Sequence, residues 1–101
     1  IMEKKIKEII FMTVKGLNET LDEDQQLKLS TETILLGKDS NINSLTLVNL
    51  IVAIEDNLED KLKVSVTLTD ERAFSQKHSP LRTIESLTDY IEMLLKEKLN
   101  D

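Results

Sequence analysis

One run of residues decides how this chain folds: Asn43-Ser44-Leu45-Thr46-Leu47-Val48-Asn49-Leu50-Ile51-Val52-Ala53-Ile54-Glu55, which follows the turn-prone segment Gly37-Lys38-Asp39-Ser40-Asn41. Apolar residues recur in this run at steps of three and four, and the pattern predicts a helix from Ser44 to about Asp60. The stripe expected to face the core consists of Leu47, Leu50, Ile51, Ile54 and Leu58. Asn43 or Ser44 is expected to cap the helix, because either side chain can accept a hydrogen bond from a free backbone N–H.

Three more apolar residues of this helix, Leu45, Val48 and Val52, lie outside the inward stripe. A helix that is apolar nearly all round is either deeply buried or offers a surface to a partner. With 101 residues and a hydrophobic content of 40%, the chain can build only a modest core. We therefore expect these three side chains to face a partner.

Two more long helices are predicted. The first runs from Glu3 to about Thr20, with Gly16 as its weakest position, because glycine costs roughly 1 kcal/mol against alanine inside a helix. The last is expected to be capped by Thr83. The inward residues of the first are Ile6, Ile9, Ile10, Thr13 or Val14, Leu17 and Leu21, and those of the last are Ile84, Leu87, Ile91, Leu94 or Leu95, and Leu99.

The segments between the helices are predicted from weaker sequence patterns. Residues 21–43 show no sustained period and are expected to form a long loop, pinned by apolar anchors at Leu27, Leu29, Ile34, Leu35 and Leu36. Residues 63–68 alternate like a strand, but a single strand has nothing to pair with, so we predict an extended connector. Thr69 is expected to cap a short helix that ends near Ser75.

Composition restricts the class of protein. The formal net charge of −6 argues against binding to nucleic acid, including by a small helix-turn-helix regulator. Cysteine is absent, which excludes disulfides and thiolate metal sites. The longest apolar run, residues 50–54, is far shorter than the ~18 residues of a membrane span, and charged residues between positions 3 and 8 interrupt any signal peptide. We expect one cytoplasmic, monomeric all-α domain over residues 2–101, with Ile1 as an added residue.

Ser44 is the strongest candidate functional residue. A hydroxyl at a helix N-terminus lies beside unpaired N–H groups and the positive end of the helix dipole, where a phosphate is well tolerated. Ser40 follows Asp39, but no helical pattern comes after it. Ser44 is followed at once by Leu45, and the acidic pair Glu55 and Asp56 falls eleven and twelve residues later.

These features resemble the acyl carrier protein family, in which the serine of a D-S-L motif begins the second helix and an acidic pair lies near that helix's end. The resemblance covers essentially the whole chain, and its specific part is N-S-L at 43–45 followed by V-x-L-I-V-A-I-E at 48–55. It implies a four-helix bundle with three long helices, a short third helix and a long loop between the first two.

The resemblance also implies a protein that is not an enzyme. A separate phosphopantetheinyl transferase would attach a 4′-phosphopantetheine arm from coenzyme A to Ser44, and the arm would carry acyl or aminoacyl groups as thioesters. The other partners would be acyl- or aminoacyl-loading and condensing enzymes, and neither nucleic acid nor a metal is expected. The partner-binding residues would be Asn43, Leu45, Val48, Val52, Glu55 and Asp56. His78 is expected to be an exposed loop residue rather than a general base.

Asn43 stands where the family usually has an aspartate. Asparagine keeps the shape and the hydrogen-bonding oxygen but loses the charge that would pair with a basic transferase. Thr46 and Asn49 occupy the first half of the helix, which tends to be acidic in carriers of primary fatty acid synthesis. These departures favour a specialised lipid, polyketide or peptide-like pathway. The alternative is a helical protein-interaction module of carrier ancestry without a prosthetic group.

Overall fold

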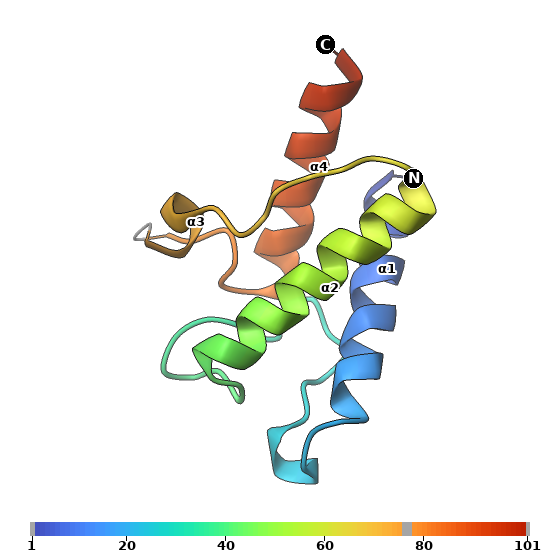
Figure 1. Cartoon of the computed structure of the whole chain (residues 1–101). Helices are drawn as coiled ribbons and strands as arrows, with labels where there is room; N and C mark the ends of the chain where they lie inside the picture. The colour runs from blue at the N-terminus through green and yellow to red at the C-terminus, as the bar shows by residue number, and fades with distance from the viewer. Residues whose placement is uncertain (1, 76–77, 101) are drawn as a thin grey trace.

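Three long helices make up most of the protein in the computed structural model, which describes residues 2–75 and 78–100 (Figure 1). They are α1 (Met2–Asn18), α2 (Ser44–Leu62) and α4 (Ile84–Asn100), joined by a short 3-10 helix η1 (Glu23–Gln25) and a five-residue helix α3 (Glu71–Ser75). The described residues contain no strand, only an isolated antiparallel bridge between Ile34 and Thr83. The prediction of an all-α chain is confirmed.

Helix α1 contacts both α2 and α4. Figure 1 shows α1 and α4 running in opposite directions, with α2 crossing α1 obliquely. The five predicted inward residues of α2 are all buried. A polar link crosses the same contact, because Asn57 Nδ2 donates to Thr13 Oγ1 over 2.8 Å while the Thr13 hydroxyl donates to the Ile9 carbonyl. The core is aliphatic, as the near absence of aromatic residues requires.

Both ends of α2 are fixed by local hydrogen bonds. Asn43 Oδ1 accepts the backbone N–H of Thr46 over 2.9 Å, so Asn43 rather than Ser44 caps the helix. At the other end, Lys63 adopts a left-handed conformation (φ 58°) and donates its N–H to the Glu59 carbonyl. The helix runs past the predicted end at Asp60, because Leu62 still packs against the core.

The long loop between α1 and α2 is held at its start by the side chain of Asn18. The Asn18 amide group donates to the Leu27 carbonyl and accepts the Leu27 N–H, each over 2.8 Å. Leu27 and Leu35 are buried, as predicted, and Ile34 and Leu36 are partly buried. Leu29 is 52% exposed, so its prediction as an anchor was wrong. Its neighbour Leu27 takes the inward position that the Asn18 bonds define.

The second half of the loop docks onto the start of α4. Backbone N–H groups of Ile84 and Glu85 donate to the carbonyls of Thr33 and Thr31, over 3.1 and 2.9 Å. In return, the Leu35 N–H donates to the Arg82 carbonyl over 2.6 Å. These bonds join two segments that lie far apart in the sequence, and they fix the loop against the start of α4.

Thr83 caps α4, as predicted. Its Oγ1 accepts the Ser86 N–H and the Ser86 hydroxyl oxygen accepts the Thr83 N–H, each over 3.0 Å, so the two residues form a reciprocal capping box. The inward residues Ile84, Leu87, Ile91 and Leu95 are buried. Leu99, by contrast, is 64% exposed. Figure 1 shows that the C-terminal end of α4 extends past the other helices.

Residues 63–70 cross from α2 to α3 without helix or strand, as predicted for an extended connector. Val66 and Leu68 point into the core and their polar neighbours are exposed. Helix α3 begins at Glu71, two residues after the predicted cap. No helix within residues 2–75 and 78–100 has the length and apolar character to cross a membrane.

Candidate functional site

Ser44 is the first residue of α2, and its side chain is exposed. Because Asn43 supplies the capping oxygen, the Ser44 hydroxyl is not needed to satisfy the helix terminus. In the part of the chain that the structure describes, neither this hydroxyl nor the backbone N–H groups of Ser44 and Leu45 have a hydrogen-bond partner. The start of α2 therefore presents a free hydroxyl beside two free N–H donors.

The start of α4 is different. Its first three N–H groups, from Ile84, Glu85 and Ser86, are taken by the two loop carbonyls and by the Thr83 side chain. Of these two helices, only α2 has open donors at the positive end of its dipole. This is the local environment in which a phosphate group is stabilised.

Ser40, the other serine near this end of α2, is already engaged. Its Oγ accepts the Ile42 N–H over 3.2 Å, and its own N–H donates to the Gly37 carbonyl over 3.1 Å. The residue is half-buried within this turn, whereas Ser44 is exposed. Of the two serines, Ser44 therefore has the more accessible hydroxyl.

An apolar strip lies on the outer face of α2, directly after Ser44. We call it the outer strip; it consists of Leu45 (71% exposed), Val48 (36%) and Val52 (42%). The inward stripe of α2 does not include these residues, so the prediction that they lie outside the core is confirmed. Apolar side chains held open to solvent on one helix face are typical of a docking surface.

The acidic pair near the end of α2 is divided between two environments. Glu55 is half-buried, and its Oε2 accepts the Leu68 N–H over 2.5 Å. Asp56 is exposed. Glu55 therefore fastens the connector to α2, a role that sequence reasoning missed because Leu68 is thirteen residues away and carries no local signal.

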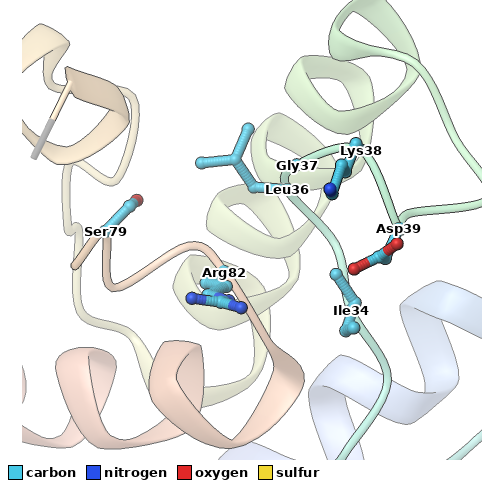
Figure 2. A pocket seen from close by; sticks show the side chains of 7 residues that line it. All are labelled: Ile34, Leu36, Gly37, Lys38, Asp39, Ser79 and Arg82. Carbon is cyan, nitrogen blue, oxygen red and sulfur yellow. The ribbon is translucent and has the colours of Figure 1, made fainter. Parts of the chain in front are cut away.

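A cavity of about 260 Å³ lies near the start of α4 (Figure 2). It opens between the loop that leads into α2 and the segment that leads into α4, and its lining includes Ile34, Leu36, Lys38, Asp39 and Arg82. Sequence reasoning did not identify it. The turn at residues 37–41 is the part of the cavity wall that the sequence pattern indicated. The position of Arg82 could not be predicted, because it depends on the hydrogen bonds that dock the loop onto the start of α4.

Among the described residues, no three or more histidine, aspartate or glutamate side chains are grouped so that they could hold a metal ion. His78 is exposed in a turn, as predicted. Comparison with protein-family models, curated proteins and solved structures finds no match to this chain.

Proposed function

We propose that this chain is an acyl carrier protein that bears a 4′-phosphopantetheine arm on Ser44. The observation that carries the proposal is the free Ser44 hydroxyl at the open start of α2, with Asn43 serving as the cap. The all-α fold and the motif that resembles the carrier family support it. The long loop and the short α3 are compatible with a carrier-like arrangement of helices.

The residues at the start of α2 fit the proposed group. Ser44 Oγ would form the bond to phosphorus as the pyrophosphate link of coenzyme A breaks in the transferase. Adenosine 3′,5′-bisphosphate would leave, and the hydroxyl proton would pass to a base of that enzyme. The N–H groups of Ser44 and Leu45 would then stabilise the phosphodiester at the positive end of the helix dipole. When bound, the arm supplies a thiol that holds cargo as a thioester.

The outer strip is the proposed contact for the transferase and for loading and condensing enzymes. It begins next to Ser44 and ends one turn before the exposed Asp56. Partners would cover Leu45, Val48 and Val52 with apolar side chains and pair basic groups with Asp56. Glu55 would contribute to partner binding indirectly, because it holds the connector against α2. Asn43 would contribute because it lies next to Ser44.

Neutral residues at 43, 46 and 49 make the start of α2 less acidic than in carriers of primary fatty acid synthesis, so we place the protein in a specialised lipid, polyketide or peptide-like pathway. The second candidate, an interaction module without a prosthetic group, is favoured by the outer strip alone. Intact mass after treatment with a broad-specificity transferase, Mg²⁺ and coenzyme A separates the two. A carrier gains one phosphopantetheine group, and an unmodified interaction module does not.

A further inference from the structure

The cavity of Figure 2 combines apolar and cationic walls. Its apolar lining comes from Ile34 and Leu36, and its cations from Lys38 and Arg82. Among the described residues, Asp39 is the one carboxylate that lines it. The cavity therefore has an excess of positive charge, although the chain as a whole carries a formal net charge of −6.

Neither cation, Lys38 or Arg82, has an ion-pair partner among residues 2–75 and 78–100, even though Asp39 lines the same cavity. An unpaired guanidinium can donate two parallel hydrogen bonds to a carboxylate from a ligand. The two cations are thus available to an anion that enters the cavity.

The backbone around the cavity is fixed by hydrogen bonds. The Arg82 carbonyl accepts the N–H groups of Leu35 and Leu36, and the Arg82 N–H donates to the Ser79 carbonyl over 3.2 Å. On the opposite side, the Ser40 N–H donates to the Gly37 carbonyl and closes the turn that carries Lys38. The cavity therefore needs little rearrangement to receive a ligand.

The cavity also lies within reach of Ser44. Asp39 precedes Ser44 by five residues, which limits the distance between their Cα atoms to about 18 Å even for an extended chain. Figure 1 shows the loop before α2 and the segment before α4 on the side of the molecule where α2 begins. A flexible arm on Ser44 would have this cavity beside it.

Resting on the proposed function, we infer that the cavity binds the free carboxylate of a dicarboxylic cargo. The cargo would be an acyl group held as a thioester at one end and carrying a carboxylate at the other. Its methylene groups would contact Ile34 and Leu36, and its carboxylate would pair with Lys38 and Arg82. Exposed carboxylates at the far end of α2, on Asp56, Glu59 and Asp60, repel such a cargo from that end.

The test uses the full chain labelled with ¹⁵N and loaded at Ser44 with one of three groups. Coenzyme A gives the bare thiol form, and hexanoyl- and adipoyl-coenzyme A give thioesters of equal chain length that differ in the terminal carboxylate. Intact mass verifies each loading before the amide chemical shifts of Gly37, Lys38 and Arg82 are compared. Relative to the unloaded protein, we expect only the adipoyl form to change the chemical shifts of these three amides. The change should become smaller in high salt.

The variant Lys38→Gln/Arg82→Gln should abolish the difference between the adipoyl and hexanoyl forms. Both side chains are exposed, so this variant should keep the fold, and Lys15→Gln on α1 serves as a control for loss of a positive charge. Loaded protein with equal shifts for both thioesters, or a shift that survives in the double variant, would overturn this inference alone. Shifts already present in the bare thiol form would assign the cavity to the arm's phosphate instead. If the protein gains no mass on treatment, the result would contradict both the proposed function and this inference.

Discussion

Asn43 and Ser44 perform different tasks at the start of α2. The Asn43 side chain accepts a hydrogen bond from the Thr46 N–H, so the Ser44 hydroxyl is not needed as a cap and remains exposed. If Ser44 were the cap, its oxygen would accept the N–H of a residue in the first turn and would be less available for reaction. The identity of the residue before the serine therefore affects both the stability of the helix and access to the hydroxyl.

Replacing Asn43 with aspartate should speed modification of Ser44. Aspartate keeps the capping oxygen and adds a negative charge, which favours association with a basic transferase surface at low ionic strength. Initial rates of modification measured at low and high salt test this, with the gain expected to fade at high salt. Asn43→Ala removes the cap without adding charge and should destabilise the protein by about 1 kcal/mol. Equal rates for Asn43→Asp and wild type at both salt concentrations would contradict a role for charge at this position.

Glu55 and Asp56 are adjacent, but their replacement by alanine should have different effects. Glu55→Ala leaves the buried N–H of Leu68 without its acceptor, which should cost about 1–3 kcal/mol of unfolding free energy. Asp56→Ala should stay within about 0.5 kcal/mol, because that side chain is exposed. Urea unfolding of both variants measures the difference. Equal stabilities would show that the Glu55 bond does not hold the connector.

Helix α2 presents two apolar faces with different surroundings. Its inward stripe is fully covered by the rest of the protein, and the outer strip is open to solvent. Burial within the protein stabilises the first face. In the proposed carrier, partners that cover the outer strip account for the apolar character of the second.

Val48→Gln should therefore leave the melting temperature nearly unchanged while it slows transfer of the arm or weakens binding of a cognate enzyme. Ile54→Ala is the matched core control on the same helix, and loss of its buried side chain should cost roughly 2–5 kcal/mol. Thermal unfolding and transferase kinetics on both variants separate stability from docking. A large loss of stability in Val48→Gln would mean that the outer strip is buried in the folded protein.

Gly16 in α1 offers a test of helix stability. A methyl group at this position would meet nothing within 4 Å, and the residue has no left-handed conformation to preserve. Gly16→Ala should therefore stabilise the protein by about 1 kcal/mol through helix propensity. Thermal unfolding provides the measurement, and an unchanged or lower midpoint would contradict an unstrained helical conformation at Gly16.

Sequence patterns predicted the features that depend on neighbouring residues. They identified the inward stripe of α2, the cap at Thr83 and the extended connector, because helix periodicity and capping are encoded within a few positions. They missed the exposure of Leu29, the Glu55–Leu68 bond and the cavity beside Arg82. Each of these depends on where distant segments meet, and the sequence carries no local pattern for such contacts.

At the scale of the whole molecule, the radius of gyration of 12.9 Å matches the ~13 Å expected of a compact domain of this length. Helix α1 packs against both other long helices, and the loop after it closes across the start of α4. The start of α2 remains open, with Ser44 and the outer strip on its surface. In the proposed carrier, the packed helices provide a rigid support for one exposed serine.

The most direct test of this account is the intact mass of three proteins treated with transferase, Mg²⁺ and coenzyme A: wild type, Ser44→Ala and Ser40→Ala. We expect wild type and Ser40→Ala to gain one phosphopantetheine group and Ser44→Ala to gain none, because only Ser44 offers a free hydroxyl at the open start of α2. Circular dichroism of Ser44→Ala verifies that its helices are intact. Modification that persists in Ser44→Ala, or a wild type that is never modified, would contradict the account.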